Sequence, residues 1–243
     1  MSVIRKRAAL LCLLCAVIVF AGIALHDVAY VPPILMYHSI SPQQPSDTLH
    51  VSQSTFQRQM GFLRKNKYNV MPLESLAALI RDKKKIPPKT VVITFDDGRK
   101  DNYTLAFPIL KEYRVPATVF ITVNEIEKPD RLSWDEIKAM EQSGIITIGS
   151  HTRDHLYLVN VNFDETLTQQ IIGSKSDLEA GLKVPISAFS YPIGGFNARV
   201  RNVVMNAGYG CAVATTPGKR YPRDHIFALK RIKISEKAGN LFV

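Results

Sequence analysis

Two histidines and two aspartates are the residues of this sequence whose types and spacing are best suited to chemistry. His151 and His155 are four positions apart, which is short enough for both imidazole rings to converge on one ion in a helix or a loop. Asp96 and Asp97 are adjacent, and their side chains diverge if the segment is extended. One carboxylate can then bind a metal while the other meets a water molecule. Two imidazoles and a carboxylate leave coordination positions open for water and substrate, so the four residues predict metal-assisted hydrolysis.

Each cluster alone also has an ordinary structural explanation. Asp-Asp-Gly after a strand is frequent in turns that cap helices, and with 6 histidines in the chain a pair at a chosen spacing can arise by chance. Together they weigh more because both follow predicted strands, Val91–Phe95 before Asp96 and Ile145–Ile148 shortly before His151. Since α/β folds place active sites at the carboxyl ends of their strands, the combination favours a metal site over two unrelated turns.

The elements that must position these residues alternate along the chain from Val31 onward. Apolar, β-branched segments alternate with helix-like ones, and this order predicts a parallel sheet covered by helices, either barrel or doubly wound. The predicted strands are Pro33–His38, Tyr68–Met71, Val91–Phe95, Ala117–Thr122, Ile145–Ile148, Ala188–Tyr191, Gly210–Ala214 and Ala228–Ile234. The predicted helices are Ser54–Lys65, Leu73–Arg81, Tyr103–Tyr113, Trp134–Gln142, Glu165–Glu179 and Asn197–Asn206.

Size and charge exclude several other classes. A chain of 243 residues with 46% hydrophobic composition can bury one substantial core, so we expect a single catalytic domain over residues 28–243. The net charge of +10 is scattered over surface segments such as Lys83-Lys84-Lys85, with no aromatic residues interleaved. This pattern indicates a solvated face and no nucleic-acid partner. Cys211 is alone in the predicted domain, which excludes an intrachain disulfide framework there.

Residues 1–27 have the pattern of a targeting segment. A basic cluster at positions 5–7 precedes an apolar or small run from Ala8 to Leu25, whose length lies between that of a signal-peptide core and that of a membrane span. Cleavage near Ala24 would release the chain, whereas a retained segment would anchor it in the membrane. In both cases the preceding positive charge directs everything after His26 out of the cytoplasm, so we expect an extracytoplasmic protein.

Two motifs resemble those of a known family. Thr-Phe-Asp-Asp-Gly at 94–98 and Ser-His-Thr-Arg-Asp-His at 150–155 are similar to the first two motifs of the polysaccharide deacetylases of carbohydrate esterase family 4. The resemblance extends from about Pro33 to Ile234. It implies a distorted (β/α) barrel with fewer than eight repeats, for which the sequence offers about seven parallel strands. It also implies hydrolysis of acetyl groups on an N-acetylated polysaccharide.

The same resemblance implies the roles of the four residues. A divalent metal, most often zinc with Co²⁺, Ni²⁺ or Fe²⁺ as alternatives, would be bound by Asp97, His151 and His155. Asp96 would be the general base. The residues alone leave open which of the two aspartates takes which role.

The third family motif, Arg-x-Pro-aromatic-Gly, is altered here to Ser190-Tyr191-Pro192-Ile193-Gly194. The arginine that orients the base and the aromatic residue beside the sugar are both absent. Serine in this place, together with the opening strand at 35–40, is similar to the subgroup that deacetylates poly-N-acetylglucosamine. That resemblance implies that Tyr191, Pro192 and Ile193 contribute to substrate or oxyanion binding, the last through its backbone N–H.

Three further residues are candidates for supporting roles. Arg231, in a predicted late strand, could approach Asp96 or remain a surface charge. The family's late acid-catalyst histidine is not recognisable; His225 is a candidate for that general acid or an ordinary loop histidine. His38, at the end of the first predicted strand, is expected to line the site.

These inferences predict an N-deacetylase acting on a glucosamine polymer, either exopolysaccharide or a wall polymer such as peptidoglycan. An O-acetyl esterase would share the same site. A glycan-binding protein that has lost catalysis is a third alternative, motivated by Ser190 and Ile193. The sequence indicates no obligate protein partner.

Overall fold

The computed structural model describes residues 32–45, 47–215 and 225–237. The predicted targeting segment at 1–27 lies outside these ranges, so the boundary expected near residue 28 stays a prediction. Within the described ranges, no helix has both the length and the apolar character that crossing a bilayer requires.

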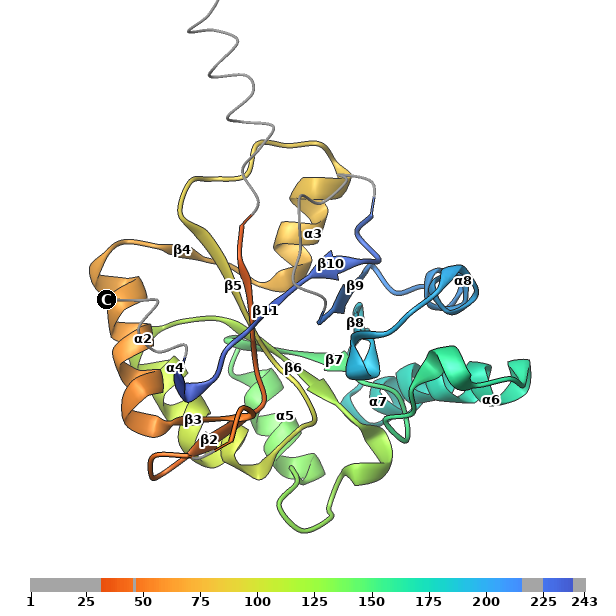
Figure 1. Cartoon of the computed structure of the whole chain (residues 1–243), viewed down its shortest axis with the longest axis horizontal. Coiled ribbons are helices and arrows are strands. Elements are labelled where there is room, and N and C mark those ends of the chain that lie inside the picture. Colours follow the sequence, from red (N-terminus) through yellow and green to blue (C-terminus); the bar gives the residue numbers. More distant parts are fainter. Residues whose placement is uncertain (1–31, 46, 216–224, 238–243) are drawn as a thin grey trace, which may run out of the picture. The chain divides into compact units, whose positions relative to one another are not determined.

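A sheet of nine parallel strands forms the centre of the domain (Figure 1). Eight of the strands follow one another in the order β10-β9-β8-β7-β6-β5-β1-β11, and β4 pairs with β5 beside this path. The strands are β1 (Ile34–Tyr37), β4 (Asn69–Val70), β5 (Thr90–Phe95), β6 (Ala117–Ile121), β7 (Ile146–Ser150), β8 (Ala188–Ser190), β9 (Cys211–Ala214), β10 (Leu229–Lys230) and β11 (Ile232–Lys233). All pairs within this sheet are parallel, which confirms the predicted α/β barrel.

The barrel is closed by one short chain segment. Leu229 of β10 pairs with β9 at one end of the strand order, and Ile232 of β11 pairs with β1 at the other end. Arg231 is the one residue that separates β10 from β11. The sequence predicts a single strand over Ala228–Ile234, whereas the structure divides this segment between two partners. Seven predicted segments therefore supply the eight strands of the path.

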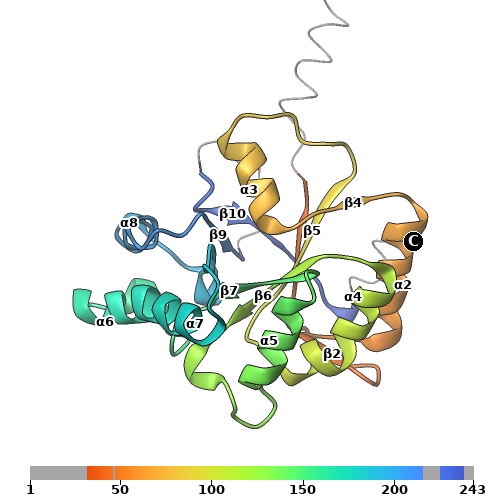
Figure 2. The same ribbon diagram turned by 180° about the vertical axis from the view of Figure 1, so that it is seen from behind.

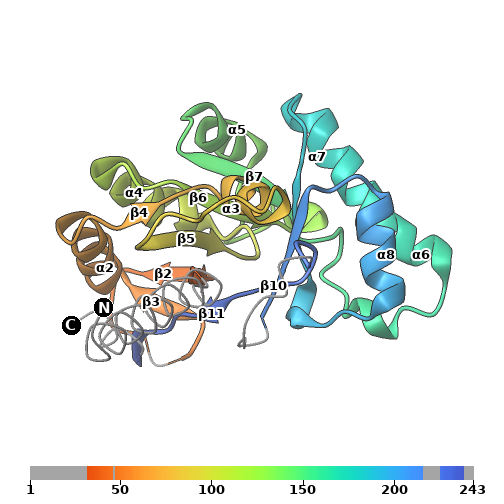
Figure 3. The same cartoon turned by 90° about the horizontal axis from the view of Figure 1, so that it is seen from above.

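Helices surround the sheet (Figures 1 and 2). They are α2 (Gln53–Lys65), α3 (Leu73–Arg81), α4 (Phe107–Tyr113), α5 (Trp134–Gln142), α6 (Asp164–Thr168), α7 (Ser174–Leu182) and α8 (Ala198–Asn206). Figure 3 shows α6, α7 and α8 grouped on one side, away from α2 and α4. Local hydrogen bonds stabilise the first turns of three helices. The Ser52 and Asn197 side chains cap α2 and α8, and Ser133 and Glu136 form a capping box on α5.

Two of the predicted helices are not continuous α-helices. A π-helical turn over Asn102–Ala106 precedes α4, and another over Gln169–Gly173 separates α6 from α7. Each inserts a wider turn with i→i+5 hydrogen bonds, which apolar periodicity does not reveal. The first of these turns directs the Asn102 side chain to the carbonyl oxygen of His38, at 2.9 Å.

Alternation of side chains along the strands produces two apolar clusters. One cluster lies between the sheet and the outer helices and includes Leu35 and Ile93. The other fills the barrel and contains Ile34 and Val92, the sequence neighbours of that pair. Helix α3 contributes to this inner cluster and begins just after β4, which pairs with the first residues of β5. The amino end of the barrel is thereby filled with apolar side chains, which leaves the carboxyl end for polar groups.

A small parallel sheet, β2 (Ser39–Ser41) and β3 (His50–Ser52), follows β1 and was not predicted from the sequence. The carboxylate of Asp101 accepts hydrogen bonds from the Ile40 backbone N–H, at 3.0 Å, and from the Ser39 hydroxyl. This contact joins the small sheet to the loop that carries Asp96 and Asp97.

Candidate active site

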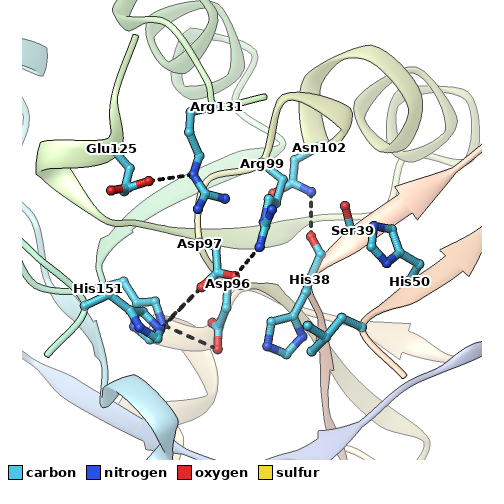
Figure 4. A network of polar contacts seen from close by, with 12 residues as sticks. His38, Ser39, His50, Asp96, Asp97, Arg99, Asn102, Glu125, Arg131 and His151 are labelled. Carbon is cyan, nitrogen blue, oxygen red and sulfur yellow. Dashed lines mark hydrogen bonds and ion pairs between the residues drawn. The ribbon is translucent and has the colours of Figure 1, made fainter. Parts of the chain in front are cut away.

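Asp97, His151 and His155 meet at the carboxyl end of the barrel (Figure 4 labels the first two). One ligand atom from each residue lies within 4.8 Å of the other two. Asp97 Oδ1 is 3.7 Å from His151 Nε2 and 3.5 Å from His155 Nε2. Donors bound to one tetrahedral zinc ion at about 2 Å stand roughly 3.3–3.5 Å apart. The two imidazoles and one carboxylate therefore fit a divalent metal in both chemistry and spacing.

Local backbone turns bring two of these side chains into place. Asp97 has φ 75° and His155 has φ 56°, in the left-handed region that non-glycine residues rarely occupy. Between the histidines, Thr152 has φ 70°, and its hydroxyl accepts the His155 backbone N–H at 3.0 Å. Three such residues around one site indicate backbone strain stored where function requires a fixed geometry.

The His151 ring is fixed by a hydrogen bond through the nitrogen that does not face Asp97. Its Nδ1 is 2.8 Å from the carbonyl oxygen of Ser190, so Nδ1 carries the proton and Nε2 is left to face Asp97. Burial lowers the pKa of His151, although the nearby Asp96 opposes this effect. The ring is therefore kept neutral, as a metal ligand must be.

Asp96 lies beside this donor set but is bound differently. Its carboxylate receives two hydrogen bonds from Arg231, Nη1 to Oδ1 at 2.7 Å and Nη2 to Oδ2 at 2.6 Å. Both side chains are almost completely buried, at 2% and 0% exposure. Burial alone would raise the pKa of Asp96, but the charge and hydrogen bonds of Arg231 outweigh it and hold the pKa far below its usual range. Asp96 is thus kept ionised.

The altered third motif and the closing segment complement each other. Arg231 Nη2 also donates to the Ser190 hydroxyl at 2.9 Å, and Nη1 donates to Thr94 Oγ1 at 3.1 Å. Its guanidinium lies over the Phe120 ring, 5.5 Å from the centroid. Ser190 occupies the position at which the family motif has arginine. The guanidinium that contacts Asp96 belongs instead to Arg231, between β10 and β11. The sequence left two interpretations of Arg231, a contact with Asp96 or a surface charge. In the structure its side chain lies in the site and not on the surface.

His38 extends from the end of β1 toward the same carboxylates (Figure 4). Its side chain is partly buried, and Nδ1 has no hydrogen-bond partner among the described residues. Burial lowers its pKa, and the charges of Asp96 and Asp97 act in the opposite direction. His38 therefore lines the site beside both aspartates, as expected from the sequence.

Tyr191 and Pro192 are buried, while Ile193 is 65% exposed with φ 58°. The Tyr191 hydroxyl donates to the Phe227 carbonyl and its backbone N–H to the Val213 carbonyl, both at 3.0 Å. Both donors of Tyr191 are therefore used within the protein. A positive φ is uncommon for a β-branched residue, and it marks the turn at Ile193 as strained.

His225 is not brought to the site. The carbonyl of the next residue, Ile226, accepts the N–H of Ala212, close to the start of β9. His225 therefore lies at the amino ends of these strands, whereas Asp96 and His151 follow the carboxyl ends of theirs. Chain direction explains the difference, because a residue reaches this edge by following a parallel strand, and His225 precedes β10.

Sequence reasoning missed a second group of residues around the site. Arg99 lies on the loop after Asp97, Asp101 and Asn102 lie in the helical turns that follow it, and Arg131 faces Arg99 from the loop before α5. The signal for the first three was their position directly after the Asp-Asp-Gly motif. No local pattern identified Arg131.

A nearly closed parallel barrel with an ion-paired carboxylate and a metal-fitting donor set at its carboxyl end has the arrangement of a metal-assisted hydrolase. The sequence profile named polysaccharide deacetylase matches residues 83–212. The chain belongs to the polysaccharide deacetylase family, which confirms the resemblance and identifies an enzyme of the deacetylase type.

Individual relatives agree with this assignment. The Bacillus subtilis (strain 168) protein YxkH is 34% identical over 203 residues, which cover 84% of this chain and 71% of YxkH. The poly-beta-1,6-N-acetyl-D-glucosamine N-deacetylase of Staphylococcus aureus (strain MRSA252) is 28% identical over 200 residues, 77% of this chain and 69% of its own. The solved structure of the Streptococcus pyogenes deacetylase PplD in complex with acetate superposes with a TM-score of 0.78 at 26% identity, covering 84% of this chain and 92% of PplD.

Proposed function

We propose that this protein is a divalent-metal-dependent N-deacetylase of an extracytoplasmic polymer of N-acetylglucosamine. The observation that carries the proposal is the pairing of two sites at one barrel end: the donor set of Asp97, His151 and His155, and beside it the ionised, buried Asp96. The name of the Staphylococcus aureus relative supports a poly-N-acetylglucosamine substrate. The extracytoplasmic location rests on the basic and apolar pattern of residues 1–27.

Each residue of the donor set has a defined task in this proposal. A divalent metal, with zinc the first choice for two imidazoles and a carboxylate, would polarise the acetyl carbonyl and lower the pKa of a water molecule. Asp97 and the two histidines hold it. Asp96 then accepts a proton from the attacking water, and Arg231 keeps Asp96 oriented and ionised between proton transfers.

The leaving amine needs a proton before the C–N bond can break. His38 is the group we assign to this step, because its ring faces both carboxylates from the side of β1. The exposed turn at Ile193 lies after β8, beside the strand that carries His151, and its backbone N–H is our candidate for a donor to the oxyanion. His225, at the other end of the strands, has no part in the proposal.

The proposal is tested by acetate release from N-acetylglucosamine oligomers. Purified protein should release acetate, lose this activity on treatment with a chelator, and regain it when Zn²⁺, Co²⁺, Ni²⁺ or Fe²⁺ is added back. The matched control is His151→Ala, which lacks one of three ligands and should not be restored by metal. Activity that survives complete metal removal would contradict the proposal.

A parallel assay with O-acetylated glycan separates the amide hydrolase from an esterase that shares the same site. Release of acetate from the O-acetylated polymer alone would favour the esterase. Binding of oligomers without any acetate release, in protein with its metal restored, would favour the glycan-binding alternative.

A further inference from the structure

Arg99 and Arg131 are held opposite each other at the rim of the site. They form an antiparallel bridge between the loop after β5 and the loop before α5. Two backbone hydrogen bonds flank the bridge, Leu132 N–H to the Gly98 carbonyl and Lys100 N–H to the Asp130 carbonyl, each at 3.0 Å. Arg99 and Arg131 are therefore a non-hydrogen-bonded pair, the arrangement in which two opposing side chains share one face and lie closest. We call these two residues the arginine pair.

Like charges directly opposite each other destabilise a pair of strands, so this arrangement needs a compensating charge. Arg99 has a 3.5 Å contact with Asp97 Oδ2, and Arg131 donates from Nε to Glu125 Oε2 at 3.1 Å. Glu125 is shared, because Lys128 also binds it at 2.9 Å. Asp97 is shared as well, since its other oxygen faces His151 and His155. The acidic partners thus compensate the arginine pair only in part.

Most hydrogen-bond donors of the arginine pair are unused. A guanidinium carries five N–H donors, yet Arg99 uses one terminal nitrogen and Arg131 uses only Nε in bonds with the described residues. Arg99 Nε and Arg131 Nη1 are buried without a partner in the same part of the chain. The side chains as a whole remain 31% and 18% exposed. Figure 4 shows both guanidinium groups directed toward Asp97, so the arginine pair lies beside the donor set of Asp97, His151 and His155.

We propose that the arginine pair binds a carboxylate carried by the sugar polymer close to the acetamide that is hydrolysed. The substrate would then be an amino-sugar polymer with acidic substituents. Guanidinium groups bind carboxylates through parallel, charge-assisted hydrogen bonds, and a bound metal would draw the charge of Asp97 away from Arg99, which increases the need for an anion. This inference rests on the proposed deacetylase function and specifies its substrate. The carboxylate can belong to a succinyl ester or to a lactyl ether, and the test separates these sources.

The experiment compares kcat/KM for three sets of N-acetylglucosamine oligomers: neutral, O-succinylated, and 3-O-lactyl-bearing (muramyl). Wild type should prefer at least one acidic set over the neutral set. Arg99→Gln and Arg131→Gln should each lower the acidic-to-neutral ratio about tenfold, the effect of losing one charge-assisted contact. Arg99→Lys and Arg131→Lys, which keep the charge, should restore part of the ratio. Arg64→Gln removes an exposed cation at the end of α2 and should leave the ratio unchanged.

The two acidic arms identify which substituent is recognised. A wild-type ratio near one in both arms, or an unchanged ratio in Arg99→Gln and Arg131→Gln, would overturn the inference while leaving deacetylation of the neutral oligomer intact. A pair that only holds two loops together would produce that outcome with lower thermal stability. Absence of acetate release from every oligomer would instead contradict the proposed function. In that case calorimetry with N-acetylmuramic acid against N-acetylglucosamine still tests the pair, since only the acidic sugar should bind about tenfold more weakly to Arg99→Gln.

Discussion

Asp96 and Asp97 are neighbours in the chain but belong to two different halves of the site. The buried half contains Asp96, Arg231 and His151, whose side chains are 2%, 0% and 2% exposed. The rim half contains Asp97 and His155, at 15% and 38%. A positive φ at Asp97 is the point where the chain passes from one half to the other.

The halves are also built by different means. The buried half is assembled across the barrel, because Arg231 reaches Asp96 from the last strand and Ser190 fixes His151 from β8. The rim half depends on local turns, such as the Thr152 hydroxyl bond that orients His155. Asp96 in the low-dielectric half should control proton transfer, whereas the rim residues, together with His151, should control what is bound.

Exchanging each aspartate for asparagine gives the largest expected contrast. Asp96→Asn should leave metal content near that of wild type while kcat falls about 10²–10⁴-fold, because the amide cannot accept the proton. Asp97→Asn should lower metal affinity itself, since a charged ligand becomes neutral. Metal analysis beside acetate release measures both. If Asp96→Asn lost its metal and Asp97→Asn retained it, the two roles would be reversed.

Removing the buried guanidinium should reduce stability more than any change at the rim. Arg231→Met leaves Asp96 as an uncompensated buried charge, which costs about 3–5 kcal/mol in the free energy of unfolding. Denaturant unfolding at pH 7 measures this loss. Arg99→Met is the control, because its 3.5 Å contact is partly exposed and is expected to be worth less than about 1 kcal/mol. Equal losses in the two variants would remove the distinction between the halves.

The same ion pair predicts how that difference depends on pH. The pKa of Asp96 is lower in the folded protein than in the unfolded chain, so its contribution to stability is fully present above the unfolded value, about 4, and is lost progressively as the pH falls from there through the folded pKa. Wild type and Arg231→Met should therefore approach each other in stability as the pH is lowered from about 5 to about 3. A difference that stayed constant over this range would show that the arginine acts through packing and not through charge.

A change within the rim turn should have a moderate effect on binding. Thr152→Ala removes the hydroxyl that accepts the His155 N–H, a loss of about 1 kcal/mol. We expect metal affinity to fall, with kcat recovering when metal is in excess. Metal titration followed by acetate release provides the measurement. A lower kcat at saturating metal would place Thr152 with the buried half instead.

The smallest effect is expected at Tyr191. Tyr191→Phe deletes a hydroxyl that donates to the Phe227 carbonyl, which should cost about 1 kcal/mol in unfolding free energy. The backbone and the ring, which stacks on Phe196 at 4.6 Å, are unchanged. We therefore expect kcat/KM to stay within about twofold of wild type. A larger fall in kcat/KM with normal stability would restore a contact between this side chain and the substrate.

The sequence predicted what local pattern determines and missed what depends on tertiary packing. The four principal residues could be predicted because each cluster is contiguous and follows an apolar strand, and the predicted bounds of α3 and α5 are identical to those observed. The division of the last strand at Arg231 could not be predicted, since both of its partners lie elsewhere in the chain. The bridge between Arg99 and Arg131 could not be predicted from the sequence either, because a single isolated pair leaves no periodic pattern.

Closure of the barrel through Arg231 has a consequence for the order of events during folding. The pairing of β11 with β1 is among the contacts of largest sequence separation in the described part of the chain, and such contacts form slowly. Until β11 docks, Asp96 lacks the guanidinium that keeps it ionised. We therefore expect Asp96 to become a fixed, ionised carboxylate only when the barrel is complete.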